Sequence, residues 1–229
     1  MTTARRPAPV GVGQVVARMR ALGTTLPPRD GVAVFNRVYL SVTEELDGRL
    51  AAGGFGDPAA AAVLAARFAA RYLRAVDAAA DRRTVPSCWR PLLQLRGHRG
   101  IRPVQFALAG INAHVGHDLA LAVVDTCAAL GCEPPSLERD FDRVGELLTS
   151  VEEHVREELM PGPDLLDLAD PLTHLAGSWS LERARDAAWA ASRVLWSLRG
   201  LPEVYEEFTE KLDAGVGLVG RFLLTPLGR

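Results

Sequence analysis

Residues 103–130, PVQFALAGINAHVGHDLALAVVDTCAAL, decide the fold of this chain because they form its longest apolar segment. A proline opens the segment, and apolar residues recur at helical spacing, which together predict one long helix. Since the predicted helix is apolar on nearly all sides, it belongs in the interior of a protein. We therefore expect an all-α, single-domain helical bundle with a central buried helix at about 103–130.

The sequence on both sides of this segment also predicts helices. Alanine is abundant and alternating β-branched residues are rare, which favours helix over strand. Asp57 and Ser180 have the residue types of helix N-caps, as does Ser136, and prolines stand at the first helical positions 58 and 202. No internal loop is long enough to mark a boundary between domains. We expect a flexible tail over residues 1–12 and one helical domain over residues 13–229.

Composition limits the classes of partner. The 229 residues are 48% hydrophobic, which is enough to form a core without disulfides or a structural metal. Lys and Arg number 26 against 28 acidic residues, so the net charge of -2 gives no overall positive field for a phosphate backbone. We expect a small-molecule ligand or substrate and no nucleic-acid partner, and the sequence does not determine the oligomeric state.

The cysteines and the amino-terminal residues indicate the compartment. The three cysteines lack the paired spacing of zinc ribbons, which points to free thiols in a reducing environment. The first residues run into Pro and Gly where a secretory signal needs an apolar run, and no segment has 18 uninterrupted apolar residues. We expect a cytoplasmic protein that does not insert in a membrane.

Three ionisable residues lie inside the predicted central helix. His114, His117 and Asp118 occupy positions i, i+3 and i+4, so they share one face of that helix. Burying such groups without partners costs a few kcal/mol each, so the fold must provide partners for them.

Three explanations of this cluster stay open. In the first, His114, His117 and Asp118 bind one divalent metal ion, such as Zn, Fe or Mn. In the second, the carboxylate orients a histidine that works as a general acid or base without a metal. In the third, the cluster is structural and bonds to surrounding helices. The spacing is less specific than the HExxH pattern of zinc proteases.

Polar residues of other predicted helices are candidates for holding a substrate beside this cluster. Arg71 has the reach to pair with a buried carboxylate such as Asp118, and Arg185 is spaced to stack on Trp189 or to contact an anion. Each has a structural alternative. Asn36 and Tyr39 would lie at the edge of the core, Arg71 would extend to the surface, and Arg185 would only stack on Trp189. The candidate substrate-binding residues are Asn36, Tyr39, Arg71, Asn112, Arg185 and Trp189.

Several strings in the chain resemble the bacterial "domain of unknown function 5995" family. They are FNRVYLSVT (35–43), FAARYL (68–73), PSCW (86–89), NAHVGHDL (112–119) and ARDAAW (184–189). Gly116 and Gly145 stand where the family pattern has asparagine, which suggests an enlarged or altered pocket. The resemblance implies an all-helical fold and the location of the site, but no reaction.

We interpret the chain as a small-molecule enzyme whose catalytic residues are His114, His117 and Asp118. Metal-assisted or acid–base hydrolysis, lyase chemistry or cyclisation, in a setting such as specialised metabolism, would each suit the site. The alternative is a non-catalytic ligand-binding or interaction protein whose His/Asp cluster is structural. Standard phosphate-binding loops and serine-nucleophile motifs do not occur in the sequence.

Overall fold

The computed structural model describes residues 11–145 and 180–226, and these residues are helical throughout apart from turns and loops. No strand occurs in these two ranges, which confirms the all-α fold. The α-helices are α1 (Val12–Thr25), α2 (Gly31–Ala51), α3 (Pro58–Ala80), α4 (Arg90–Leu95), α5 (Pro103–Ala113), α6 (Leu119–Leu130), α9 (Leu181–Leu198) and α10 (Pro202–Leu223). A π-helical turn η1 (His114–Asp118) joins α5 to α6, and a 3-10 turn η2 (Pro134–Leu137) follows α6.

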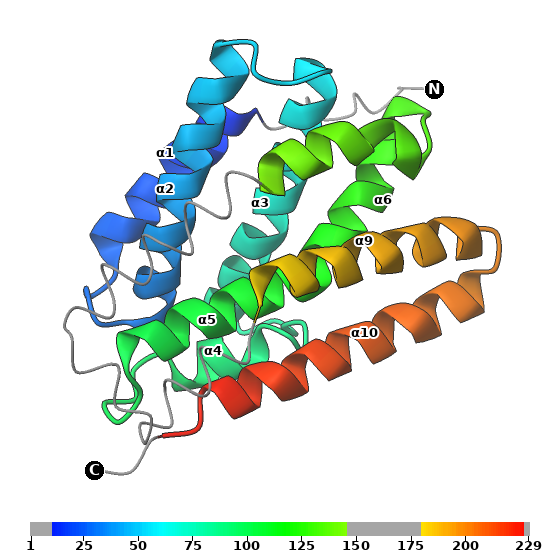
Figure 1. Cartoon of the computed structure of the whole chain (residues 1–229). Coiled ribbons are helices and arrows are strands. Elements are labelled where there is room, and N and C mark those ends of the chain that lie inside the picture. The colour runs from blue at the N-terminus through cyan, green and yellow to red at the C-terminus, as the bar shows by residue number, and fades with distance from the viewer. Residues whose placement is uncertain (1–10, 146–179, 227–229) are drawn as a thin grey trace, which may run out of the picture.

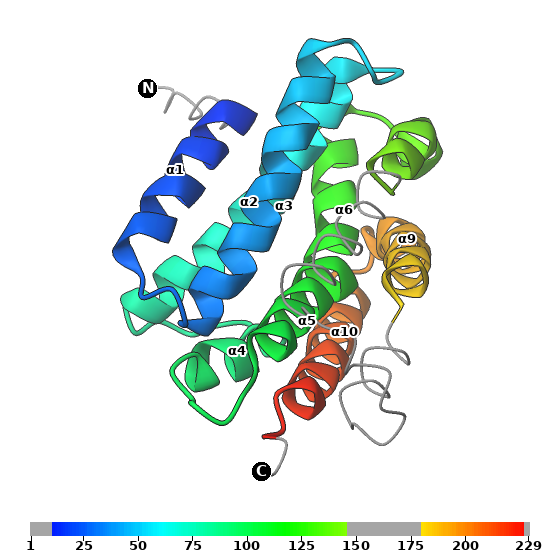
Figure 2. The ribbon, with the colours of Figure 1, turned by 60° about the vertical axis from the view of Figure 1, so that its left-hand side comes forward.

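The segment formed by α5, η1 and α6 runs through the middle of the molecule, as expected (Figure 1). Turned by 60°, the same ribbon has α1, α2 and α3 on one side of this segment and the pair α9 and α10 on the other (Figure 2). α5 packs against α2 and α10, and α6 packs against α3 and α9. The segment Pro103–Leu130 is long and apolar enough to cross a membrane, but 94% of its apolar window is buried among the other helices. Such burial is typical of a core helix.

The central segment differs from the expected regular helix at its middle. The Leu119 N–H donates to the carbonyl of His114, five residues earlier, instead of to the fourth residue back. Such π turns are rare in proteins, and many of those that occur lie at functional sites. The irregular turn contains both central histidines and Asp118.

Side-chain caps begin several helices where the sequence predicts them. The Asp57 carboxylate accepts hydrogen bonds from the N–H groups of Ala59 and Ala60 at the start of α3. The Ser180 hydroxyl accepts one from the Arg183 N–H at the start of α9. These caps satisfy amides that have no partner inside the helix.

The helix expected after Ser136 begins differently. Ser136 lies within the 3-10 turn η2, and helical residues follow from 138 to 145. The remainder of that predicted helix, to about residue 159, lies outside the described residues, as does the tail before residue 11. The buried carboxylate of Asp140 accepts from the N–H groups of Gly56 and Asp57, which holds this helical segment against the start of α3.

Two glycines allow α2 and α5 to pack closely. A Cβ atom on Gly110 of α5 would lie 2.3 Å from the Phe35 ring of α2. A Cβ atom on Gly31 of α2 would lie 2.5 Å from the Phe106 ring of α5. Because each glycine accommodates a buried aromatic ring of the other helix, the two helices interlock.

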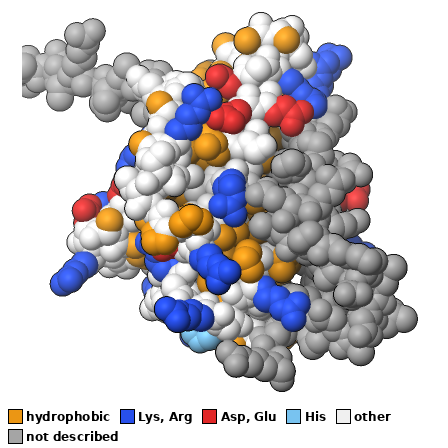
Figure 3. Space-filling model, turned by 90° about the vertical axis from the view of Figure 1, so that its left-hand side faces the viewer, with side chains coloured by type: hydrophobic (Ala, Val, Ile, Leu, Met, Phe, Trp, Pro, Cys, Tyr) orange, Lys and Arg blue, Asp and Glu red, His pale blue; other side chains and the backbone are white. Residues whose placement is uncertain are grey.

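The surface carries mixed charge. On the face shown in Figure 3, basic, acidic and hydrophobic side chains are interspersed, and the basic side chains are spread over the face instead of forming one patch. This distribution agrees with the nearly neutral composition.

Candidate functional site: a shared carboxylate between two histidines

Asp118 lies at the centre of the site and is 2% exposed. Its Oδ2 accepts a hydrogen bond from the indole Nε1 of Trp89 at 2.9 Å and lies 3.0 Å from Nδ1 of His114. Its Oδ1 lies 2.9 Å from Nδ1 of His117. An ionised carboxylate only accepts hydrogen bonds, so both imidazoles donate through Nδ1 and keep the lone pair on Nε2. One buried carboxylate therefore fixes the tautomer of two histidines.

The charge of Asp118 is stabilised despite its burial. Burial alone raises the pKa of this carboxyl, but the hydrogen bonds from His114 and His117 lower it to about 2. The carboxylate is thus ionised at neutral pH, with three donors directed at its two oxygens.

His114 lies inside a cluster of aromatic rings. Its ring stacks on Phe68 with centroids 3.6 Å apart and forms an edge-to-face pair with Tyr39, with centroids 4.4 Å apart. The rings of Phe35, Tyr72 and Trp89 complete the surroundings. Burial lowers the pKa of His114, although Asp118 opposes this effect. Within the described part of the chain, Nε2 of His114 has no hydrogen-bond partner.

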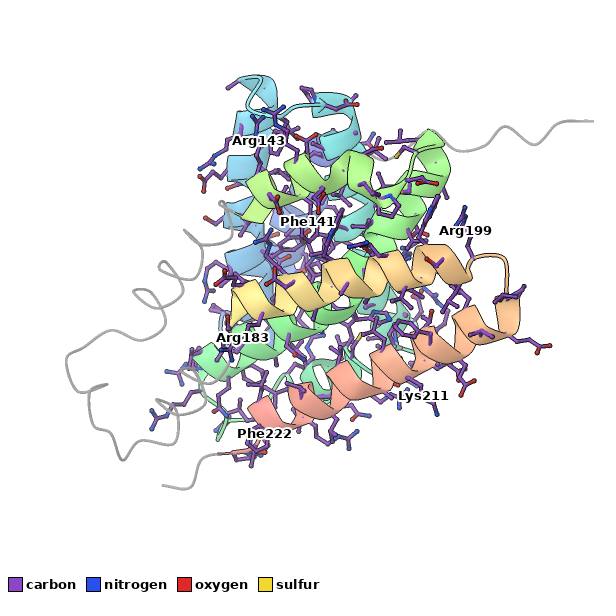
Figure 4. All side chains as sticks on the ribbon, turned by 45° about the vertical axis from the view of Figure 1, so that its right-hand side comes forward. Phe141, Arg143, Arg183, Arg199, Lys211 and Phe222 are labelled. Carbon is purple, nitrogen blue, oxygen red and sulfur yellow. The ribbon has the colours of Figure 1, made fainter. Side chains whose placement is uncertain are left out.

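His117 points the other way, to an open cleft. The cleft has a volume of about 680 Å³ and is formed by residues 84–87, by Arg90 at the start of α4, by His117 and Leu121, and by residues 209–214 of α10. Lys211, labelled in Figure 4, projects from α10 at this cleft. His117 therefore has its Nδ1 on a buried carboxylate while its side chain forms part of the cleft wall.

Two further side chains approach His117 at the cleft. Nε2 of His117 lies 3.9 Å from Oδ1 of Asp213. One donor atom each from Cys88, His117 and Asp213 lie within 4.8 Å of one another, so the three side chains are close enough to act together. Burial raises the pKa of the Cys88 thiol, and the neighbouring carboxylates of Asp118 and Asp213 raise it further. Because the thiolate is the nucleophilic form, these surroundings do not suit a cysteine nucleophile.

The backbone of the loop 84–89 is fixed to α10. Oδ2 of Asp213 accepts from the Ser87 N–H at 2.7 Å, and Oδ1 accepts from the Cys88 N–H at 2.9 Å. Gly217, one turn further along α10, lies so close to this loop that a Cβ atom there would be 2.5 Å from the Ser87 carbonyl oxygen. Burial raises the pKa of the Asp213 carboxyl, but hydrogen bonds from Cys88 and Ser87 lower it overall.

One protein-family model matches nearly the whole chain. The model of a family of unknown function matches residues 12–226, from the first residue of α1 to beyond the end of α10. The chain belongs to the family DUF5995. The family resemblance expected from the sequence strings is therefore confirmed. No curated protein and no solved structure matches this DUF5995 member.

Two of the expected substrate-binding residues of this DUF5995 protein hold helices together. The Asn36 amide donates to the Met19 carbonyl of α1 and accepts from the Tyr72 hydroxyl of α3. The Asn112 amide donates to the Val216 carbonyl of α10. Both side chains thus satisfy buried groups at helix contacts.

The expected partner of Arg71 is corrected by the structure. Its guanidinium bonds to Asp125 at 2.6 Å, not to Asp118. Arg71 and Asp125 are neighbours on α3 and α6, while the carboxylate of Asp118 is already surrounded by Trp89 and the two histidines. Arg71 therefore does not reach the cleft beside His117.

Tyr39 and Arg185 line a separate space. A cavity of about 40 Å³, lined mainly by apolar side chains, lies between α2, α3 and the helical residues 138–145, and Phe68 and Phe141 form part of its wall. The expected stacking of Arg185 on Trp189 is corrected. The Arg185 guanidinium lies over the Phe141 ring at 5.1 Å, and Trp189 packs against the same ring.

The two glycines that depart from the family pattern have neighbouring side chains over them. A Cβ atom on Gly145 would lie 2.1 Å from the Arg185 guanidinium, and one on Gly116 would lie 3.2 Å from Val216. Arg185 and Val216 therefore lie where a side chain at these two positions would begin.

Trp89, Cys88 and Asp213 were not among the expected site residues. The string PSCW was noted for its resemblance to the family, and it contains the first two of them. Asp213 follows His117 by 96 positions on an amphipathic helix full of exposed charges, and nothing in the local sequence distinguishes it.

Proposed function

We propose that this protein is a small-molecule enzyme whose catalytic centre is the His117–Asp118 pair at the wall of the cleft. The observation that carries the proposal is that His117 lines the cleft while its Nδ1 is held by a buried carboxylate. A carboxylate in this position fixes the orientation and tautomer of the imidazole, so that Nε2 faces away from it and can exchange a proton with a substrate.

Charge at the cleft favours a small polar substrate. Its walls carry charge of both signs, with Arg90 and Lys211 against Glu210 and Asp213, and Ser87 and Thr209 bring hydroxyl groups. A hydrolase or lyase acting on a small polar substrate suits these walls, in a cytoplasmic setting without nucleic acid. In this proposal His114 supports the catalytic pair from the aromatic interior by sharing Asp118.

Comparative metabolite conversion tests the proposal. The full chain, treated with a chelator, is incubated with pooled bacterial small molecules, and consumed compounds are identified by mass spectrometry. We expect conversion by the natural protein to fall at least about 100-fold in H117Q, the size of a general acid–base contribution. H98Q, which changes an exposed histidine, is the matched control. Equal conversion by H117Q, or no compound consumed, would count against His117 as a general acid or base that works without a metal.

The non-catalytic alternative gains support from the interior of the cluster. His114 is enclosed by aromatic rings, and its hydrogen bond to Asp118 is part of the core. A protein in which the whole cluster is structural would lose stability in H117Q without a change in any conversion.

A further inference from the structure

We infer that Cys88, His117 and Asp213 form a binding site for a thiophilic divalent cation of the zinc type. The inference concerns cation binding and holds whether or not the cleft is catalytic. The donor set differs from the one expected from the sequence, with which it shares only His117.

The donor atoms lie slightly further apart than the ligands of a zinc site. Zinc bond lengths of about 2.0–2.3 Å in tetrahedral geometry place neighbouring donor atoms about 3–4 Å apart. Nε2 of His117 and Oδ1 of Asp213 are 3.9 Å apart, and the full set including the Cys88 sulfur falls within 4.8 Å. Shifts of about 1 Å or less, within the range of side-chain rotation, would close the set around one ion.

His117 makes the hydrogen bond that is typical of a metal-binding histidine. Such a histidine presents one ring nitrogen to the cation and donates its other N–H to a carboxylate or carbonyl. Here Nδ1 of His117 is bound to Asp118 at 2.9 Å, which leaves the Nε2 lone pair on the side of Cys88 and Asp213.

The backbone fixes the other two donors. The Asp213 carboxylate accepts hydrogen bonds from the N–H groups of Ser87 and Cys88, and these bonds hold the cysteine next to the aspartate. Each carboxylate oxygen has two lone pairs, so Oδ1 of Asp213 keeps one for a cation. Gly217 permits the close approach of α10 to the loop before α4, which brings Asp213 next to Cys88.

Local charge also favours a cation. Two carboxylates, Asp118 and Asp213, lie on either side of His117, and Cys88 adds a thiolate once a metal displaces its proton. A thiolate in the set selects zinc, cobalt or iron over magnesium and calcium. Three protein donors beside an open cleft leave the fourth position for water or substrate, which is the arrangement of catalytic zinc sites.

The cation would change the chemistry at His117. With Nε2 bound to the metal, the imidazole no longer accepts a proton, and a water on the cation loses its proton more readily. Activity measured in chelated protein therefore tests the proposed function, and metal titration tests this site, so the two can fail separately.

Cobalt titration of the full chain without a histidine tag tests the inference. We expect one equivalent of Co²⁺ to bind with a thiolate-to-cobalt charge-transfer absorption, and one equivalent of Zn²⁺ to abolish it. C88S should lose this absorption, and D213N should weaken binding at least tenfold. C132S, which changes a half-buried cysteine elsewhere, is the control and should bind as the natural protein does.

A measurement on the natural sequence avoids any variant that fails to fold. X-ray absorption of the zinc complex should show one sulfur at about 2.3 Å and nitrogen or oxygen ligands at about 2.0–2.2 Å. Absence of stoichiometric cobalt binding, an unchanged charge-transfer absorption in C88S, or a zinc shell without sulfur would overturn the inference.

Discussion

Asp118 is the residue on which the buried cluster depends, because three donors from two different helical regions converge on it. Trp89 comes from the residue before α4, and the two histidines come from the π turn. A donor left unpaired in the interior costs about 1–3 kcal/mol, and here the same side chain serves all three.

Asp118→Ala should therefore lower the free energy of unfolding by at least about 3 kcal/mol, since it leaves three buried polar groups without their acceptor. Urea denaturation of the full chain gives the value. Asp77→Ala on α3 is the control, because that carboxylate pairs with Arg18 at the surface and such pairs contribute at most about 1 kcal/mol. A change within about 0.5 kcal/mol for Asp118→Ala would contradict the role assigned to this carboxylate.

The spacing of residues along one helix predicted part of this cluster. Positions i, i+3 and i+4 were enough to expect His114 and His117 beside Asp118. The same spacing could not predict that the two imidazoles share the carboxylate and turn their Nε2 atoms in different directions. That outcome depends on the π turn and on Trp89, a residue 29 positions away.

At the scale of elements, the fold depends on where helices approach closely. Gly110 and Gly48 make a matched pair, because both are helical but only the first faces a neighbouring helix. A Cβ atom on Gly110 would overlap the Phe35 ring, whereas nothing lies within 4 Å of a Cβ atom on Gly48.

Gly110→Ala should destabilise the protein by about 1–3 kcal/mol through overpacking of α2 against α5. Gly48→Ala should instead stabilise it by up to about 1 kcal/mol, because alanine favours helix at an exposed position. Thermal and urea denaturation of both variants check the opposite signs. A stabilised Gly110→Ala variant would show that α2 and α5 do not interlock as described.

The pH dependence of folding belongs to the whole molecule, because the buried cluster joins helices from both sides of the central segment. The folded protein keeps His114 neutral, and burial lowers its pKa from the usual 6.5. Above pH 6.5 the neutral imidazole is no disadvantage to folding. As pH falls below that value, the unfolded chain binds a proton that folded His114 refuses, so stability is lost.

We expect the free energy of unfolding to decrease between pH 7 and pH 5, with a contribution from this one histidine of at most about 1.4 kcal/mol per pH unit. Asp118 adds a further loss only at lower pH, between its ordinary pKa of 3.8 and the folded pKa of about 2. H114Q should show a shallower slope than the natural protein over pH 7 to 5, and H98Q should not. Equal slopes in H114Q and the natural protein would refute the buried neutral state of His114.

The sequence by itself determined the helical class, the central apolar segment, the caps at Asp57 and Ser180, and the family strings. These features depend on residue type and on the spacing of residues close together in the chain, and both are given directly by the sequence. Only the tertiary structure decided that Asp118 serves two histidines, that Arg71 pairs with Asp125, and that Cys88 and Asp213 meet at His117. Cys88 and Asp213 are 125 positions apart, and their contact depends on how closely α10 packs against the loop before α4, which local patterns do not encode.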